Sequence, residues 1–567
     1  MVVCEDLAQL AEQRVDDAAQ TCAWQLLLRV VAHALDYDMQ ICDPEALEPI
    51  LLELAAAMRQ AAERILGKHL DDGAWAQIAL PTRFGGMGLQ IPSLQVAATA
   101  YWAAVEATAD EVRRIATANC RPILHAPDLG VKIRAQAILR EAGLEVSSNR
   151  LELTPFMRRM LECALWKMDV PPGMAFSLDG ETAVDVQCET ANSGSTTTTT
   201  SAPPPNAQAN YRFLEPIDKC SRRRLQGRIM RGLDLAAAVR AWDRQRDHRR
   251  RRAMFEAGGP GAGATWTAPP GRHEVKMTGA QWLTGVLLRL ALMTRPPGCD
   301  VCQIYKAGRK RCSAKLDDDL GHVSNCNSGP ARHRPHECVK HALGHKLRRA
   351  GAHIDVERFV PELYTPDHEA ILDLSVSFPG SAEVHLLDIT VRNPEAAGRA
   401  KADGSSSVEQ RAKYDKGRRY GPTVVPIIIG HRGRMPQSTR EALAKLAAEA
   451  RRWAVPKLGQ RPGVPLSALQ LTIEAAALRA VADAHLLAVG AHSAAALGWQ
   501  LARQVAARSR GDTQMCRACP EEAAGDLEQQ ASPEADLAGK LQGVGVADTQ
   551  QPEEEEDNIF SFPLDLN

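Results

Sequence analysis

Long apolar runs are missing from this sequence. The most apolar candidate, Trp282–Met293, is interrupted by Arg289, so no stretch reaches the ~20 residues that a membrane-spanning helix needs. The first residues, MVVCEDLAQLAEQ, lack the basic start of a secretory signal. The 14 cysteines are scattered, without the paired framework of a secreted disulfide-rich domain. Together these absences predict a reduced, intracellular protein.

Aromatic residues are also scarce, at 4% of the chain, whereas apolar residues reach 45% and are ample for hydrophobic cores. The length of 567 residues predicts roughly three or four domains. The net charge is −1, but arginines gather within Arg222–Arg252 and acidic residues within Pro552–Asp557. We expect the first to be a basic arm that neutralises phosphates or acts as a nuclear address, with a solvated helix face as an equal alternative. The second is typical of a disordered acidic tail.

The segment 363–430 has the pattern of a small sheet. Three short runs rich in Val, Ile and Leu are bounded by Gly, Pro or Asn: Ile371–Phe378, Val384–Val391 and Val424–Ile429. Pro379-Gly380 predicts a tight turn, and hence antiparallel pairing, between the first two runs. Before the third run, residues 406–416 have the capping box and composition of a helix.

Two of these predicted strands contain a carboxylate. Asp373 lies inside the first and Asp388 inside the second, and a buried carboxylate is costly unless a charged group meets it. Pairing the strands would bring both to one edge, where their oxygens suit a hard divalent cation. Lys413 and Lys416 share one face of the predicted helix and could point at the same edge. Two carboxylates, a metal and a lysine suffice to activate water against a phosphodiester. The plainer alternative is that the acidic residues end strands and cap loops.

A second group of residues has the spacing of a zinc site. Cys299-x-x-Cys302 places two thiolates at one point, and His322-x-x-x-Cys326 adds two ligands from a helical turn. Four such ligands close a tetrahedral site, so its role would be structural. Because the loop between the pairs is long, four other residues could substitute: Cys312, His333, His336 and Cys338. The pair Cys516 and Cys519 is isolated, and we assign it no role.

These motifs resemble the restriction-enzyme-like endonuclease domain of non-long-terminal-repeat retrotransposons. That domain has an Asp, a spacer, a second acidic residue, and a lysine that in many members lies in the following helix near an A-x-x-x-K-Y-like segment. Asp373, Asp388 and Ala412-Lys413-Tyr414 match this pattern. Leu372 replaces the usual Pro before the first Asp, and Thr390 stands where restriction enzymes usually have Lys.

The order of the other motifs is similar to the same polyproteins. The family places a Cys-Cys-His-Cys motif before its endonuclease, preceded by a leucine-rich helix, as Gln281–Leu290 precedes Cys299. LPTRFGGMGL at Leu80–Leu89 follows a long helix that is expected from Pro44 to Gly67, and it resembles the segment after the family's reverse transcriptase core. The polymerase's Tyr/Phe-x-Asp-Asp turn has no counterpart, so we expect the polymerase to be absent from this chain.

The resemblance implies a metal-dependent endonuclease that hydrolyses a DNA phosphodiester bond. Asp373 and Asp388 would hold Mg²⁺, and Lys413, or Lys416 from the next turn, would orient water or stabilise the transition state. Glu357 or Glu362 would be the third acidic ligand.

The same resemblance implies cofactors, partners and a location. A structural Zn²⁺ would lie on Cys299, Cys302, His322 and Cys326. The partners would be DNA and element RNA, without a membrane, and the protein would act in the nucleus. The basic segment Arg332–His345 would contact the DNA backbone or pack on the zinc module.

The fold class expected is α+β and multidomain. A helical N-terminal region, a small zinc-binding module and an α/β restriction-endonuclease-like core with a mixed sheet precede a helical and disordered C-terminus. The expected boundaries are 1–165 for the helical region, 166–275 for a largely disordered linker and basic arm, 276–350 for the zinc module, 351–456 for the endonuclease, 457–510 for a helical extension and 511–567 for the tail. Two alternatives stay open: a catalytically inactive zinc-containing nucleic-acid-binding protein, which Leu372 favours, and a helical scaffold without a nucleic-acid role.

Overall fold

The protein is described from a computed structural model. The described residues are 2–13, 19–118, 129–146, 151–167, 225–246, 248–259, 261–268, 272, 275–296, 298–305, 311–326, 330–363, 370–393, 408–453 and 464–490. All of them lie in the first of two compact units, residues 1–511. The Ser/Thr/Pro linker, Cys516, Cys519 and the acidic tail lie outside the described residues.

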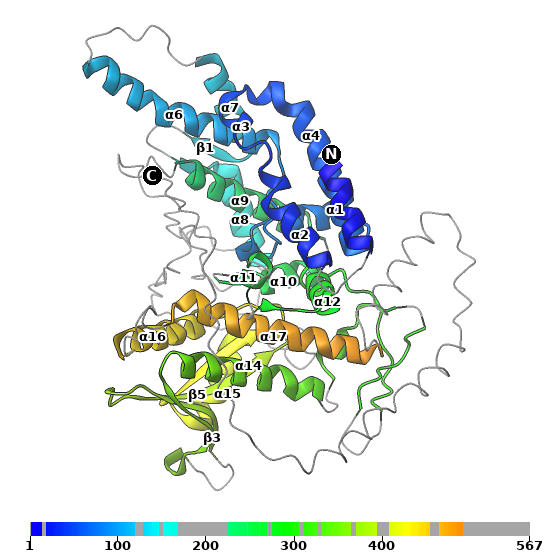
Figure 1. Cartoon of the computed structure of the whole chain (residues 1–567), viewed down its shortest axis with the longest axis vertical. Coiled ribbons are helices and arrows are strands. Elements are labelled where there is room, and N and C mark those ends of the chain that lie inside the picture. Colours follow the sequence, from blue (N-terminus) through cyan, green and yellow to red (C-terminus); the bar gives the residue numbers. More distant parts are fainter. Residues whose placement is uncertain are drawn as a thin grey trace, which may run out of the picture. The chain divides into compact units, whose positions relative to one another are not determined.

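The described residues form many helices and two sheets (Figure 1). The α-helices are α1 (Val2–Gln13), α2 (Ala19–Arg29), α3 (Asp38–Ile41), α4 (Pro44–Leu66), α5 (Asp72–Ala79), α6 (Leu94–Ala118), α7 (Leu129–Glu141), α8 (Pro155–Lys167), α9 (Leu225–Arg244), α10 (His248–Glu256), α11 (Ala264–Thr267), α12 (Gly279–Arg289), α13 (Gly321–Ser324), α14 (Pro330–Arg349), α15 (Val408–Tyr420), α16 (Gln437–Trp453) and α17 (Leu466–Ala488). The strands are β1 (Leu144–Val146), β2 (Leu151–Leu153), β3 (His353–Phe359), β4 (Ile371–Ser377), β5 (Val384–Arg392) and β6 (Val424–Gly430). Short 3-10 turns are η1 (Val31–His33), η2 (Thr82–Phe84) and η5 (Pro361–Leu363).

Helix α4 begins and ends where its local sequence predicts. The side chain of Asp43 accepts a hydrogen bond from the Glu45 amide at 3.2 Å, and Pro44 takes the first helical position, where its missing N–H is not needed. Gly67 ends the helix in the left-handed conformation, at φ 60°.

Residues 225–256 form helices where a largely disordered basic arm was expected. Ile229, Leu235 and Trp242 of α9 are buried in one core with residues of α6, α7 and α8. Arg250 of α10 pairs with Asp71, at 2.9 Å between Nη1 and Oδ2. These helices belong to the folded protein because they supply apolar core residues as well as charge.

The charge that interrupts the apolar run at residues 282–293 has a structural role. Arg289 of α12 is only 1% exposed, and it donates to the carbonyls of Gly86 (2.8 Å) and Thr82 (2.7 Å) in the glycine-rich loop 80–89. Burial lowers its pKa to about 10, against the opposing charge of Glu474 on α17, so it stays protonated. The loop and α12 are thereby joined through one buried cation, whereas Glu474 accepts from the Thr265 amide at 3.1 Å and so joins α17 to α11.

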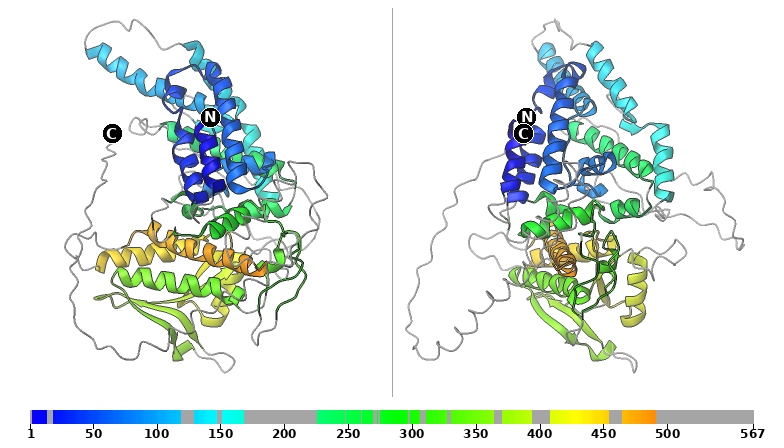
Figure 2. Two further views of the ribbon diagram at one scale, coloured as in Figure 1. Left: turned by 45° about the vertical axis from the view of Figure 1, so that its right-hand side comes forward. Right: turned by 90° about the vertical axis from the view of Figure 1, so that its right-hand side faces the viewer.

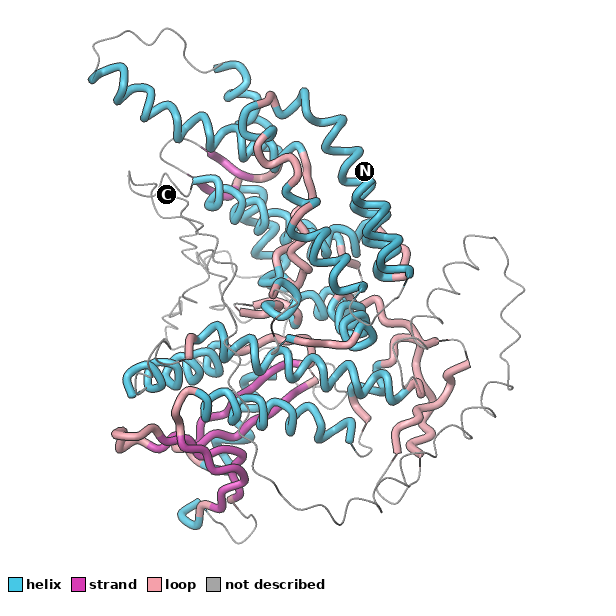
Figure 3. The backbone as a smooth tube through the Cα atoms, viewed as in Figure 1, coloured by secondary structure: helices cyan, strands magenta, loops and turns pink. Residues whose placement is uncertain are grey.

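The larger sheet has the strand order β3-β4-β5-β6 (Figure 3, strands in magenta). β3, β4 and β5 are antiparallel neighbours, and β6 lies parallel to β5 after the crossover helix α15. The three predicted strands and the antiparallel turn are confirmed, and β3 is an addition. Its sequence, HIDVERF, is rich in charged and polar residues, as is common for the edge strand of a sheet.

Helices α14 and α17 lie side by side over this sheet (Figures 1 and 2). Val339 and Leu343 of α14 and Ile473 of α17 are buried in one core with the strands. The far half of α17, including Leu486, is buried in the core that contains α12 and the cysteine cluster. Residues 330–349 therefore pack with the sheet rather than forming part of a separate zinc module, and α17 is a central element rather than an extension.

None of the described helices is both long and apolar enough to cross a membrane.

Candidate functional site

Four cysteine and histidine side chains converge in the segment after α12. The ligand atoms of Cys302, Cys312, His322 and Cys326 all lie within 4.8 Å of one another. Cys312 Sγ is 3.5 Å from Nε2 of His322 and 3.7 Å from Cys326 Sγ. Three thiols and one imidazole are the donor set of a closed structural zinc site, so this cluster could hold such a metal.

A short hairpin brings the first two cysteines together. Val301 pairs with Lys315 and Tyr305 with Arg311 in antiparallel bridges, so the chain returns alongside itself. Within it, the Cys302 amide donates to the Ala314 carbonyl at 2.9 Å, and the Cys312 amide donates to the Ile304 carbonyl at 2.7 Å.

A tight turn supplies the other two ligands. His322 lies on α13, and its amide donates to Asp317 Oδ1 at 3.1 Å. Cys326 follows the helix, with its amide on the Val323 carbonyl at 3.2 Å. Burial, with the neighbouring thiols adding to it, raises the pKa of Cys302 to about 12. A bound cation would reverse this, since coordinated thiols are deprotonated.

The prediction that Cys299 is a zinc ligand is wrong. Its Sγ donates to the Val489 carbonyl at 3.5 Å, at the end of α17, and Cys312 takes its place in the cluster. The Cys-x-x-Cys spacing suggested a single turn, but the hairpin brings Cys312 back opposite Cys302. Of the other substitutes, His333 is exposed, Cys338 packs against the sheet core and His336 contacts Asp373.

The two strand carboxylates lie next to each other. Leu374 pairs with Leu387, which leaves Asp373 and Asp388 as the next residues along neighbouring strands. The register therefore places the two residues opposite each other, and Asp373 Oδ2 accepts from the Ile389 amide at 2.6 Å. Asp388 is 4% exposed, in the middle of a strand whose central residues are buried.

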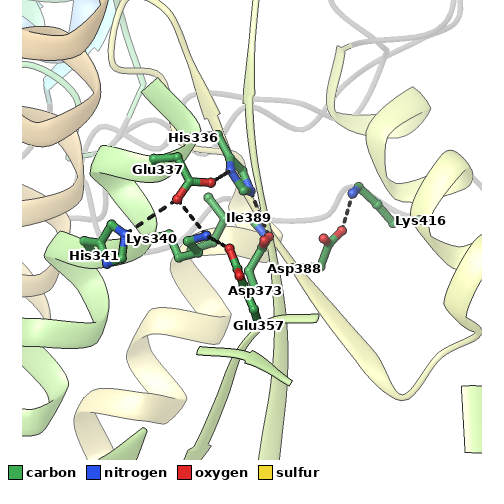
Figure 4. Close-up of polar contacts among 9 residues, drawn as sticks. All are labelled: His336, Glu337, Lys340, His341, Glu357, Asp373, Asp388, Ile389 and Lys416. Carbon is green, nitrogen blue, oxygen red and sulfur yellow. Dashed lines mark hydrogen bonds and ion pairs between the residues drawn. The ribbon is translucent and has the colours of Figure 1, made fainter. Parts of the chain in front are cut away.

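A basic side chain meets each carboxylate from a different helix (Figure 4). His336 of α14 reaches Asp373 Oδ2 through Nε2 at 3.0 Å. Lys416 of α15 forms an ion pair with Asp388 Oδ2. The side chain of Lys413, the other predicted lysine, lies outside the described residues.

Helix α14 contributes a charged network that the sequence did not reveal (Figure 4). Glu337 accepts from Nδ1 of His336 at 3.1 Å and pairs with Lys340 at 2.7 Å. The side chain of Lys340 is 1% exposed and also reaches Glu357 at 2.7 Å. In the sequence, this charged face of α14 is indistinguishable from a solvent-exposed helix face. Its partner on β3 is brought to it only by the fold.

Glu357 is the better placed of the two suggested third carboxylates. The pairs Val356–Leu374 and Arg358–Leu372 put it level with Asp373 on β3, at φ 55°. Such a left-handed conformation is strained for a non-glycine residue. Both side chains are exposed, that of Glu357 to 64%, but Glu362 lies outside the sheet on η5.

The surroundings shift the pKa values of the two aspartates in opposite directions. Burial raises the pKa of Asp388, and Asp373 acts in the same direction, against Lys416. Burial also acts to raise the pKa of Asp373, but the hydrogen bond and charge of His336, together with the hydrogen bond from the Ile389 amide, act against it, and the net shift is downward. The hydrogen bond to Asp373 raises the pKa of His336.

The two aspartates offer fewer metal ligands than the cysteine–histidine cluster does. Within the described residues, the cysteine–histidine cluster is the group in which three or more ligand atoms converge, so Asp373 and Asp388 offer two. Mg²⁺ is usually held by one or two carboxylates together with waters and substrate phosphates.

Compared with protein-family models and with curated proteins, the chain matches none of them.

Proposed function

We propose that this chain is a metal-dependent DNA endonuclease of retroelement origin, without the polymerase core. The observation that carries the proposal is the pairing of Asp373 and Asp388 on neighbouring strands with Lys416 on the second carboxylate. A strand interior is an expensive place for two carboxylates, and a cation-dependent reaction gives a reason for them.

Each residue would have a distinct role in phosphodiester hydrolysis. Asp373 and Asp388 would hold Mg²⁺, which supplies Lewis acidity and a bound water. Lys416 would orient the attacking water or stabilise charge on the phosphate oxygens. Its reach to Asp388 makes it a better candidate than Lys413. A DNA substrate would place the protein's action in the nucleus.

The cysteine–histidine cluster would support this site structurally. Asn325 lies between the ligands His322 and Cys326, and its Oδ1 accepts from Asn393 Nδ2 at 3.0 Å. Asn393 directly follows β5, the strand of Asp388. Zinc would therefore help to hold the end of the strand that carries the second carboxylate.

One observation favours a second candidate, a catalytically inactive zinc-containing nucleic-acid-binding protein. His336 and Lys416 already neutralise the two carboxylates. The charges therefore need no metal in order to be buried.

The deciding test is nicking of supercoiled plasmid by the purified full chain with Mg²⁺. The change Asp388→Asn keeps shape but removes a charged ligand, and we expect nicking to fall more than roughly 100-fold. Asp355→Asn, on the same sheet but at its edge strand, is the matched control and should nick normally.

DNA binding without Mg²⁺ is measured on the same proteins. Binding without nicking in the unaltered chain would establish the inactive candidate. Nicking by Lys416→Gln and by Lys413→Gln is compared to decide which lysine takes part in catalysis. We expect nicking to be lost in Lys416→Gln.

A further inference from the structure

The carboxylate of Asp373 is held at one of its two oxygens. Oδ2 accepts a hydrogen bond from the Ile389 amide of β5 at 2.6 Å, and Nε2 of His336 on α14 reaches the same oxygen at 3.0 Å. A carboxylate oxygen has two lone pairs, and these two donors occupy both of them. If Asp373 holds a cation, Oδ1 is therefore the oxygen that remains for it.

The histidine that reaches Asp373 is itself held by its neighbours on α14 (Figure 4). The Nδ1 atom of His336 lies 3.1 Å from Oε1 of Glu337. The other oxygen of Glu337, Oε2, pairs with Nζ of Lys340 at 2.7 Å, and the side chain of Lys340 is buried. The imidazole ring therefore has a carboxylate at each of its two nitrogens, and these contacts fix its orientation between α14 and the sheet.

In this arrangement His336 does not serve as a metal ligand itself. An ionised carboxylate only accepts hydrogen bonds, so the ring nitrogen that faces Asp373 donates its proton to Oδ2. A ring nitrogen that carries a proton has no lone pair to offer a cation. Any effect of His336 on a cation at the carboxylate site therefore acts through Asp373.

We propose that His336 is a positioning residue, which holds the Asp373 carboxylate by Oδ2 and leaves Oδ1 for the cation. The inference rests on the proposed function, because it takes Asp373 as a ligand. A carboxylate that is fixed before the cation arrives loses less conformational freedom on binding. Hydrogen-bond partners of metal ligands typically contribute roughly 10- to 100-fold to metal affinity. We expect a contribution of that size from His336.

The test is binding of Mn²⁺ to the zinc-loaded full chain, measured by electron paramagnetic resonance. Mn²⁺ takes the same oxygen ligands as Mg²⁺ and is paramagnetic, and the Mn²⁺ that is lost in Asp388→Asn defines the carboxylate site. His336→Leu removes the hydrogen-bond donor, and we expect the Mn²⁺ affinity of this site to fall by roughly 10- to 100-fold. His336→Gln keeps an N–H donor and should recover most of the loss, which a merely structural role would not predict.

A second histidine–aspartate pair on the same sheet provides the matched control. Nε2 of His353 lies 3.2 Å from Oδ1 of Asp355 on the edge strand β3, and the side chain of His353 is 73% exposed. His353→Leu should bind Mn²⁺ normally, because Asp355 is not a proposed ligand. If His336→Leu does not fold, Glu337→Gln replaces it. That change removes the charge that holds Nδ1, and it should weaken Mn²⁺ binding by roughly 10-fold.

Nicking by the same proteins separates a failure of this inference from a failure of the proposed nuclease. In His336→Leu, the Mg²⁺ concentration for half-maximal nicking should rise while the KM for DNA stays unchanged. If the unaltered chain binds Mn²⁺ but does not nick, the nuclease proposal fails, and the Mn²⁺ affinities alone decide the role of His336. Three results would overturn that role: no Mn²⁺ binding at the carboxylate site, unchanged affinity in His336→Leu, or the same loss in His336→Gln as in His336→Leu.

Discussion

Single polar side chains join elements that are far apart along the chain. Asp483 of α17 accepts from Gln281 of α12 at 2.7 Å and pairs with Arg334 of α14 at 2.8 Å. Hydrogen bonds that involve a charged group contribute about 1.5–3 kcal/mol each. Three helices thus share one carboxylate, which helps to hold α17 in register between its two cores.

His485 predicts a pH dependence of stability. Its folded pKa of about 4 lies below its ordinary value of 6.5, so the unfolded state binds more protons between these values. The stabilisation is fully present above pH 6.5 and is lost as the pH falls toward 4. We expect the unfolding free energy to fall by about 2–3 kcal/mol more than in His485→Gln. Urea unfolding from pH 7 to 4.5 measures this, and parallel curves for the two proteins would contradict it.

Cys312 and Cys299 form a matched pair for testing whether the cysteine–histidine cluster binds zinc. Cys312→Ser removes a thiol from the converging group, so purified protein should lose its zinc. Cys299→Ser should keep it, because that thiol contacts the Val489 carbonyl instead. Metal analysis of both proteins decides the ligand set, and the opposite pattern would restore the Cys299 assignment.

At the scale of elements, the glycine-rich loop 80–89 works by close backbone approach. A Cβ at Gly86 would lie 1.9 Å from the Leu80 carbonyl oxygen, and one at Gly85 would lie 2.1 Å from the Met254 carbonyl oxygen. The loop can therefore pack tightly between α5, α10 and Arg289 only where side chains are missing.

Gly86→Ala should destabilise the protein by more than about 2 kcal/mol, since backbone atoms must move to admit the methyl group. Gly227→Ala is the control: a Cβ there meets nothing within 4 Å, and the residue is in helix α9. Its helix propensity should make that variant neutral or slightly more stable. Denaturant unfolding of both measures the contrast, and a stable Gly86→Ala would contradict the close-packing explanation.

At the scale of the whole folded unit, α17 connects the sheet to the cysteine–histidine cluster. Its first half is buried with the strands and its second half with the cluster segment. The Gln303 amide donates to the Ala488 carbonyl at 2.9 Å at its far end. We therefore expect changes at the cysteine–histidine cluster to reach the sheet through α17 and through the hydrogen bond between Asn325 and Asn393.

Removing zinc should thus loosen the strand that carries Asp388, although the metal would not contact the carboxylate site. Chelation should lower Tm and increase hydrogen exchange in α17 and at the end of β5, because the cluster's thiols lose the ion that holds them together. Cys299→Ser, which keeps the cluster, should respond in the same way. If hydrogen exchange in β5 did not change after metal loss, the cysteine–histidine cluster would not stabilise the carboxylate site.

The sequence alone predicted features that depend on local pattern. Apolar runs and Pro379-Gly380 were sufficient for three strands and their antiparallel turn, and Asp43-Pro44 and Gly67 were sufficient for α4. The position of Asp373 beside Asp388 followed, because pairing two short strands through a known turn leaves little freedom of register.

Tertiary structure alone decided the rest. Cys312 rather than Cys299 joins the cluster because a hairpin folds back over residues whose spacing is uninformative. Strand β3 and the face of α14 with His336 and Lys340 are rich in charge, so they look solvent-exposed until their partners on the sheet are known. The same holds for Arg289, whose partners lie about 200 residues away in sequence. Local periodicity carries no information about contacts at such separations, and these contacts determine which charges are buried.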